Sequence, residues 1–286
     1  MSDTLFCFGY GYCAAVLAAR LRARGWAVRG TSRDPAKLAT MRDQGIDAFA
    51  FSRESPLADP QAALAGVTHV LHSVVPDAGG DPVLDRHLSD LQACPTLRWL
   101  GYLGTTAVYG DRGGAWVDED TPIEPTLARA DRRARAEAGW LASGLPVHIF
   151  RLAGIYGPGR NAFVSLRDGT ARRIVKPGTV FSRIHVDDIA SVLEASIARP
   201  RPGAVYNVCD DEPEAAAEIV RYAAELMGVE PPPEQDYATA ELSPMARTFY
   251  RDSRRVRNRR IREELGVELA YPTYREGLQA LLAAGR

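Results

Sequence analysis

Lysine is nearly missing from this sequence. Lys37 and Lys176 are the only lysines, and the other 33 of the 35 basic residues are arginines. Any chemistry that requires a lysine therefore has two candidate residues. The formal net charge is -1 at pH 7, which disfavours a polyanionic partner bound by bulk electrostatics.

Cysteines and long apolar runs are scarce as well. The four cysteines are Cys7, Cys13, Cys94 and Cys209. Neither a C-x-x-C spacing nor a nearby histidine accompanies them, so we expect no metal site and no thioredoxin-like motif. Free thiols are typical of a reducing compartment, which predicts a cytoplasmic protein. No run approaches the ~18 apolar residues of a transmembrane helix, and the uncharged stretch 5–19 lacks a signal peptide's positive start, so no membrane partner is expected.

Short apolar runs alternate with helical patterns along the 286 residues. This alternation is typical of right-handed βαβ units, in which helices cover both faces of a parallel sheet. The predicted strands are 4–9, 26–31, 47–51, 67–74, 98–105, 146–153 and 205–208. The predicted helices are 14–24, 36–44, 83–93, 127–143 and 186–198. The pattern is irregular after residue 155, and the chain is mostly helical beyond residue 213.

A glycine-rich turn separates the first predicted strand from the first predicted helix. Its sequence, from Gly9 to Ala14, reads G-x-G-x-x-A. In this context the glycines permit a tight turn and close approach to a pyrophosphate, which the helix N-terminus also favours. We therefore predict a dinucleotide site here rather than a plain tight turn. The candidate cofactor-binding residues of this loop are Gly9, Tyr10, Gly11, Tyr12 and Cys13.

The end of the second predicted strand indicates which dinucleotide is bound. NAD-binding sites usually have an acidic residue there for the ribose 2′-hydroxyl, but this chain has Ser32 and Arg33. A guanidinium suits a 2′-phosphate, so we expect NADP, with NAD as the weaker alternative. Asp34 precedes Pro35 and is better explained as a helix N-cap. Ser73, at the end of the strand predicted at 67–74, completes the cofactor set.

Five later segments resemble, in order, the motifs of a known family. Residues 102–110 (YLGTTAVYG) resemble its S-S-x-x-V-Y-G strand end, 118–122 its E-x-x-P loop, 151–159 (RLAGIYGPG) its R-x-x-x-V-Y-G-P-G segment, 183–190 (RIHVDDIA) its R-x-I-H-V-D-D-I-A signature, and 206–208 the strand that follows. The chain is thereby identified as similar to the NAD(P)-dependent epimerase/dehydratase group of extended short-chain dehydrogenases/reductases. The resemblance covers roughly residues 5–210.

The resemblance implies a fold and a division into domains. The fold class is α/β, a doubly wound Rossmann-type fold with a mainly parallel seven-stranded sheet and a smaller C-terminal substrate region. Residues 1–155 are expected to form the NAD(P)-binding domain, to which 179–210 return. Residues 156–178 and 211–286 are expected to form the substrate-binding region.

The family's catalytic Tyr-x-x-x-Lys pair is absent from the chain. Pro125 and Glu137 match the landmarks that flank the pair, and together they place it at positions 129 and 133, which are Arg129 and Arg133. Arg133 keeps a positive charge for the cofactor ribose. Arg129 cannot exchange a proton near neutrality, so it is assigned to substrate binding. Thr105 matches the family's Ser/Thr position and is the candidate catalytic residue, with a structural hydrogen bond as the alternative.

The resemblance implies an NADP-linked oxidoreductase or epimerase-like protein that acts on a small polar substrate, with a nucleotide sugar as one candidate. Arg160, Asn161 and His185 are further candidates for substrate binding, although the segment around His185 also fits a structural or capping role. Tyr109, Tyr156 and His185 are the candidate substitutes for the missing tyrosine. The alternative function is a non-catalytic NAD(P)-binding regulatory or scaffolding protein. A homodimer is compatible with either function.

One arginine-rich run could suggest nucleic-acid binding. Seven arginines occur between residues 251 and 262, and Glu263 and Glu264 follow at once. No aromatic residue interleaves the run after Tyr250, so a solvated, salt-bridged face is favoured over a phosphate contact, and no nucleic-acid partner is expected.

Overall fold

The computed structural model describes residues 3–285. The chain divides into two compact units. The first unit consists of Met1–Thr105, Ala128–Arg151 and Leu193–Tyr206, and the second consists of Thr106–Leu127, Leu152–Val192 and Asn207–Arg286. This partition groups 106–127 with the C-terminal residues, whereas the sequence assigns them to the first domain. The functional division into domains stays a prediction.

A seven-stranded sheet organises the first unit. Its strands in spatial order are β11 (Val205–Val208), β7 (Val147–Leu152), β5 (Trp99–Thr105), β4 (His69–His72), β1 (Thr4–Phe8), β2 (Ala27–Ser32) and β3 (Asp47–Ala50). The pairs β1–β2, β1–β4, β2–β3 and β4–β5 are parallel. From β1 the chain first adds strands on one side (β2, β3) and then on the other (β4, β5, β7, β11). The predicted doubly wound, mainly parallel seven-stranded sheet is therefore confirmed.

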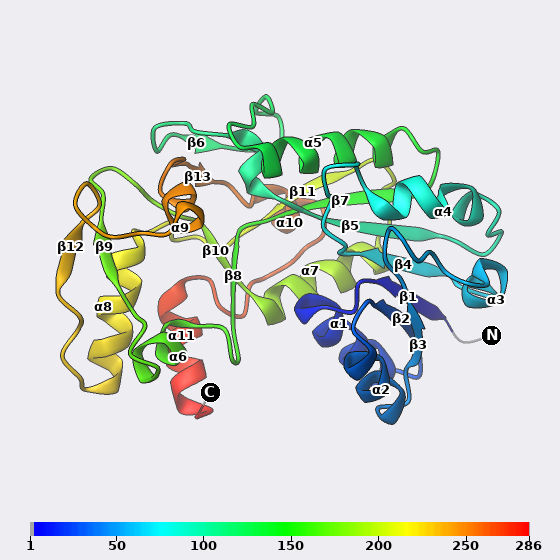
Figure 1. Ribbon diagram of the computed structural model, residues 1–286, viewed down its shortest axis with the longest axis horizontal. Helices are drawn as coiled ribbons and strands as arrows, with labels where there is room; N and C mark the ends of the chain where they lie inside the picture. Colours follow the sequence, from blue (N-terminus) through cyan, green and yellow to red (C-terminus); the bar gives the residue numbers. More distant parts are fainter. Residues whose placement is uncertain (1–2, 286) are drawn as a thin grey trace. The chain divides into compact units, whose positions relative to one another are not determined.

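Helices cover both faces of this sheet. They are α1 (Tyr12–Ala23), α2 (Pro35–Asp43), α3 (Pro60–Leu64), α4 (Pro82–Gln92) and α5 (Ala128–Leu141), and α7 (Val186–Ala198) runs from the second unit into the first. Figure 1 shows α4 and α5 on one face of the strands and α1 on the other. Between the layers lies a core of buried aliphatic and aromatic side chains, in which Phe8 contacts Phe51 with ring centroids 5.5 Å apart.

An Asp-Pro dipeptide starts three of these helices. Asp34, Asp59 and Asp81 are the N-caps of α2, α3 and α4, and each carboxylate accepts a backbone N–H of the first turn. The proline that follows occupies the first helical position, where a missing N–H costs nothing. The sequence therefore specifies these three helix starts locally.

Asp81 also joins three elements of the unit. Its carboxylate accepts the Nε2–H of His72 on β4 (2.7 Å) and the Nε1–H of Trp140 on α5 (3.1 Å), and all three side chains are buried. The N–H of Val74 donates to the other ring nitrogen of His72, so Nε2 carries the ring proton. Burial alone would raise the pKa of Asp81, but His72 and the hydrogen bonds hold it at about 2.

The second unit contains short strands and helices. The strand pairs are β8 (Gly154–Tyr156) with β10 (Arg183–His185), β9 (Arg173–Val175) with β12 (Glu234–Asp236), and β6 (Trp116–Val117) with β13 (Arg255–Val256). The helices are η1 (Thr106–Tyr109), α6 (Ala162–Arg167), α8 (Ala216–Met227), α9 (Pro244–Phe249), α10 (Arg259–Glu263) and α11 (Tyr274–Ala283). Within residues 3–285, no helix has the combination of length and hydropathy that crossing a membrane requires.

Substitution of Asp81 tests how strongly the buried carboxylate holds the first unit together. We expect Asp81→Ala to lower the free energy of unfolding by about 3–5 kcal/mol, because it removes an N-cap and leaves two buried donors without partners. Asp59→Ala is the matched control, since Asp59 caps α3 without a buried partner, and should cost about 1 kcal/mol. Denaturant unfolding measures both losses. Equal losses in the two variants would contradict the role given to the buried contacts.

Candidate functional site

The peptide of Gly9 is held from both sides of β1. Its N–H donates to Oγ1 of Thr31, at the end of β2 (2.8 Å), and its carbonyl accepts the Oγ–H of Ser73, just after β4 (2.6 Å). We call Thr31 and Ser73 the hydroxyl clamp. Gly11 N–H donates to the same carbonyl (2.8 Å), so the turn of the loop is fixed by three hydrogen bonds.

The two glycines of the loop lack a side chain for different reasons. Gly9 has φ +83°, and a Cβ there would lie 2.9 Å from Ser73 Oγ, so the fold itself requires glycine. Gly11 has φ -94°, and a Cβ there would meet no atom closer than 4.0 Å. The open space at Gly11 fits a ligand that approaches the backbone closely.

Helix α1 begins at this loop without a side-chain cap, because its N-cap is Gly11. The neighbouring helices α2, α3 and α4 each have an aspartate in that place. The positive end of the α1 dipole is therefore not neutralised by a carboxylate at its N-cap, an arrangement that suits a phosphate. Tyr10 and Cys13 are buried, and Tyr12 is half-buried.

Arg33 lies at the surface where β2 passes into α2. Its side chain is exposed, and within the described residues it makes no hydrogen bond or ion pair. Asp34 instead accepts the N–H of Ala36 as the cap of α2 (2.9 Å), and Ser32 Oγ accepts the N–H of Asp34 (3.1 Å). Within the described residues, the guanidinium of Arg33 is therefore available to bind a ligand, whereas Ser32 and Asp34 are engaged in hydrogen bonds with the backbone.

Arg133 is fixed against β5. Its Nη1 donates to Leu103 O (2.9 Å) and to Tyr102 Oη (3.2 Å), and its guanidinium lies 5.8 Å from the centroid of the Tyr102 ring. Arg129 is half-buried one turn earlier on α5, and Thr105 is half-buried at the end of β5. The first unit thus includes all three residues that the sequence places at the centre of the chemistry.

A buried ion pair lies one turn beyond Arg133. Glu137 Oε2 accepts the Nε–H of Arg151 at 3.0 Å, and both side chains are almost fully buried. Burial raises the pKa of Glu137, while the charges of Arg151 and Arg133 oppose that rise. A Cβ at Gly104 would lie 2.6 Å from Glu137 Oε1, so the glycine allows α5 to approach β5.

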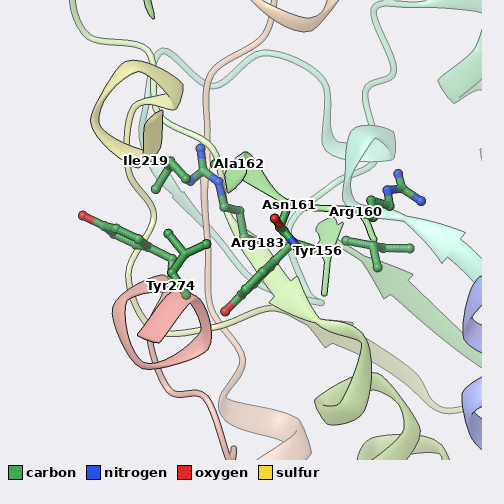
Figure 2. Close-up of a pocket in the computed structure, with 9 residues that line it drawn as sticks. Tyr156, Arg160, Asn161, Ala162, Arg183, Ile219 and Tyr274 are labelled. Carbon is green, nitrogen blue, oxygen red and sulfur yellow. The ribbon is translucent and has the colours of Figure 1, made fainter. Parts of the chain in front are cut away.

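The second unit contains a pocket of about 250 Å³. Its lining combines two arginines, two tyrosines, one asparagine and aliphatic side chains, namely Ile155, Tyr156, Arg160, Asn161, Ala162, Arg183, Ile219, Tyr274 and Leu278. Figure 2 shows the guanidinium of Arg183 on the side of Ile219 and that of Arg160 pointing away from Tyr274. Arg160 and Asn161, two of the predicted substrate-binding residues, are therefore brought together here.

Asn161 and His185 both have capping contacts. Asn161 Oδ1 accepts the first N–H groups of α6, from Phe163 (3.0 Å) and Val164 (3.2 Å). His185 Nδ1 accepts the N–H of Asp187 at the start of α7 (3.2 Å). The His185 ring is buried and does not line the pocket. The predicted substrate roles of both residues stay predictions.

The two tyrosines considered as proton donors are buried. Tyr109 donates to Asn207 Oδ1 at 2.8 Å. Tyr156 packs so tightly against α11 that a Cβ at Gly277 would lie 2.0 Å from its hydroxyl oxygen. Burial raises the pKa of Tyr156, which makes the phenol a poor proton source near neutrality.

Sequence reasoning missed Arg183 and Asp210 as functional candidates. Asp210 comes two residues after β11 and is 1% exposed. Burial raises the pKa of Asp210 to about 8, although the charge of Arg183 lowers it. Its place just after a buried strand was the available signal, because ligands of parallel sheets bind at the carboxyl ends of strands.

Most of the arginine-rich run has partners within the second unit. Arg262 pairs with Asp211 (2.6 Å), Arg254 donates to Gly110 O (2.8 Å), and the Arg257 guanidinium lies 4.9 Å from the centroid of the Trp116 ring. These contacts agree with the salt-bridged face that the sequence favours. Within residues 3–285, no group of three or more His, Cys, Asp or Glu side chains is arranged to hold a metal ion.

Comparison with known proteins identifies relatives along nearly the whole chain. No family model matches. YeeZ of Escherichia coli K12 is 27% identical over an alignment of 275 positions that covers 92% of this chain and 94% of that protein. The 3-diazoavenalumate denitrifying reductase of a Streptomyces species is 29% identical over an alignment of 295 positions, gaps included, which covers 92% of this chain and 94% of that protein.

Several solved structures also align with nearly the whole chain. A conserved protein of unknown function from Silicibacter pomeroyi is 54% identical, with a TM-score of 0.91 over 99% of both chains. A protein from Methylobacillus flagellatus, assigned to the NAD-dependent epimerases/dehydratases, is 26% identical, with a TM-score of 0.71 over 100% of this chain and 99% of that one. The dTDP-glucose 4,6-dehydratase of Bacillus anthracis, solved with NAD, shares the fold at 17% identity, with a TM-score of 0.77 over 99% of this chain and 96% of that one.

The hydroxyl clamp predicts a specific effect on dinucleotide binding. Thr31→Val and Ser73→Ala each remove one hydrogen bond of about 1 kcal/mol that holds Gly9, so each should weaken the affinity for an NAD(P) dinucleotide about three- to tenfold by calorimetry. Thr96→Val is the control, because it removes a comparable hydroxyl bond, to Val67 O (2.6 Å), before β5 begins. The clamp has no such role if the control weakens binding as much as the two test variants.

Proposed function

We propose that the chain, which is similar to NAD-dependent epimerases/dehydratases of the short-chain dehydrogenase/reductase superfamily, is an NADP-linked oxidoreductase or epimerase-like protein acting on a small polar substrate. The observation that supports this most strongly is the glycine loop. It combines a clamped turn at Gly9, open space at Gly11 and a helix without a carboxylate cap. These features fit a pyrophosphate, as the predicted roles of Gly9 to Cys13 require.

Residues of the first unit would bind and orient the cofactor. Arg33 would pair with the 2′-phosphate of NADP, since no protein group competes for its guanidinium in the described chain. Arg133 has both protons of Nη1 engaged, so Nε and Nη2 are the donors it would offer to a ribose hydroxyl. When bound, the nicotinamide would supply or accept a hydride. Thr105 would hydrogen-bond the reacting oxygen of the substrate.

The pocket of the second unit is the proposed substrate site. Arg160 and Asn161 line it, together with Arg183, which gives it cationic groups beside apolar walls. A polar substrate with an anionic group suits this lining. A nucleotide sugar, as in the dehydratase of Bacillus anthracis, is one such substrate.

The alternative function is a regulatory or scaffolding protein that binds the dinucleotide without turnover. The contacts of Arg133 favour this alternative, because a guanidinium fixed to Leu103 O and Tyr102 Oη adds charge without a proton to exchange. The half-buried hydroxyl of Thr105 at the end of β5 favours the enzyme. Turnover of NADPH distinguishes the two functions.

Cofactor choice is tested at Arg33. A charge-assisted hydrogen bond contributes about 1.5–3 kcal/mol, so Arg33→Ala should weaken NADP binding roughly tenfold to a hundredfold while the affinity for NAD hardly changes. Arg42→Ala is the control, because Arg42 lies on α2, which follows Arg33, and donates to Ala48 O. Calorimetric titration of wild type and variants with NADP and with NAD gives the ratio of the two affinities. Equal wild-type affinities for NADP and NAD would refute the preference.

Catalysis is tested by restoring the family's pair. Arg129→Tyr combined with Arg133→Lys returns a titratable phenol and an amine at i and i+4 on α5. We expect the double variant to raise NADPH-linked reduction of a carbonyl substrate above the wild-type rate. Arg135→Lys is the control, because Arg135 is exposed on the same helix and pairs with Asp131 (2.8 Å).

The wild-type rate decides how this result is interpreted. Turnover in the ordinary enzymatic range, on the order of 1–1,000 per second, would mean that another residue supplies the proton. Single substitutions of Tyr109, Tyr156 and His185 would then identify that donor by the loss of rate.

A further inference from the structure

Arg183, which lines the second-unit pocket, donates hydrogen bonds to the protein from only one of its three guanidinium nitrogens. Arg183 Nη1 donates to Phe181 O (2.8 Å) and Glu214 O (2.9 Å), which engages both protons of that nitrogen. Within the described residues, the guanidinium forms no ion pair with a carboxylate. The edge formed by Nε and Nη2 is left with two donors in a fixed plane.

Other groups that could bind a phosphate are few in this pocket. The N–H groups at the start of α6 are already accepted by Asn161 Oδ1. Arg160 is exposed, and its guanidinium points away from Tyr274 in Figure 2. Neither of the chain's lysines lines the pocket. A single two-donor edge matches the two oxygens of a carboxylate, whereas a diphosphate would lack partners for its remaining oxygens.

Aliphatic side chains and two tyrosines form the rest of the lining, and within the described residues the buried hydroxyl of Tyr274 has no hydrogen-bond partner. Ile219 and Leu278, from α8 and α11, are buried, and Ile155 on β8 adds a third aliphatic side chain. The volume of about 250 Å³ is below the ~300–1,000 Å³ of pockets for drug-sized ligands. A flat or short hydrocarbon group fits these walls better than a hydrated sugar.

We propose that this pocket binds a small carboxylate with an apolar body, with the carboxylate on the Nε/Nη2 edge of Arg183 and the body against the three aliphatic side chains. The inference rests on the proposed function in taking the pocket as the substrate site, and it narrows the small polar substrate to a carboxylate whose remaining body is apolar. The ligand's carboxylate supplies the counter-charge that the protein does not place in contact with Arg183.

Asp210 gives this site a pH dependence. Its backbone N–H donates to Arg183 O on β10 (2.6 Å), and its carboxyl interacts electrostatically with Arg183, with Tyr156 on β8 and with the adjoining Cys209 and Asp211. Burial raises the pKa of Asp210 to about 8, which favours its protonated, uncharged form near neutral pH and leaves the charge of Arg183 to the ligand. Above this pH the ionised Asp210 competes for Arg183. Affinity for a carboxylate should therefore fall as the pH rises through about 8.

Binding of 3-phenylpropionate to the full chain, measured by calorimetry without any nucleotide, tests the proposal. The uncharged analogue 3-phenylpropionamide should bind at least about tenfold more weakly to the wild type, since it lacks the charge-assisted bond. Arg183→Met should weaken the affinity for the acid by a similar factor and hardly change the affinity for the amide. Ile219→Trp, which fills the pocket, should weaken both ligands.

Three results would overturn the proposal. They are equal affinities for acid and amide in the wild type, unchanged binding of the acid to Arg183→Met, and displacement of the acid by lower concentrations of UDP-glucose. The amide comparison needs no variant, so it remains decisive if Arg183→Met fails to fold. Because no dinucleotide is present, a failure here is distinguishable from a failure of the NADP-linked function.

The pH series tests the role of Asp210 separately. The probe's carboxyl stays ionised above neutrality, so a change between about pH 7 and 9 reports the protein. Wild-type affinity should fall across this range, whereas Asp210→Asn should show a flat profile. Asp211→Asn is the control, because Asp211 pairs with Arg262 and Asn258 outside the pocket. A wild-type profile as flat as that of Asp210→Asn would overturn the role of Asp210.

Discussion

The peptide of Gly9 is hydrogen-bonded by hydroxyls from the strands on both sides of β1, and the geometry of the proposed cofactor site depends on that arrangement. Thr31 and Ser73 fix the direction in which the chain leaves the sheet, and hence where Gly11 and the start of α1 lie. A loop with positive φ would otherwise sample many conformations. The sheet thus orders the loop before any ligand arrives, which lowers the entropic cost of binding.

The arginines of the candidate sites differ in how many of their donors bind acceptors of the protein. In the first unit, Arg133 and Arg151 satisfy acceptors of the protein itself, a phenol and two carbonyl or carboxylate oxygens. At the surface, Arg33 has no partner among residues 3–285. In the second unit, Arg183 is intermediate, because protein carbonyls hold one nitrogen and leave the other two. A guanidinium with five donors can be anchored and still bind a ligand, which an ammonium group does less precisely.

Local sequence patterns were sufficient to predict the sheet and its helices. The side-chain contacts of the candidate sites could not be predicted, because they join residues far apart in the sequence. Strand β11 matches its predicted bounds, and α7 begins and ends at the predicted residues. Helix α1 begins at Tyr12 rather than Ala14, because Gly11 itself is the N-cap. Asp34 acts as the predicted cap. In contrast, the contacts of Arg133 with β5 and of Arg183 with Glu214 O join residues about 30 positions apart, and no local spacing encodes them.

One wall of the second-unit pocket depends on a missing side chain. The phenol of Tyr156 occupies the space that a Cβ at Gly277 would need, with only 2.0 Å between the two positions. Positions 156 and 277 are therefore coupled, and their substitution effects should not add. During divergence, a larger residue on α11 could be accepted only together with a smaller one on β8. Related chains should thus vary at these two positions jointly, and each joint change would give the pocket a different shape and a different preference among ligands.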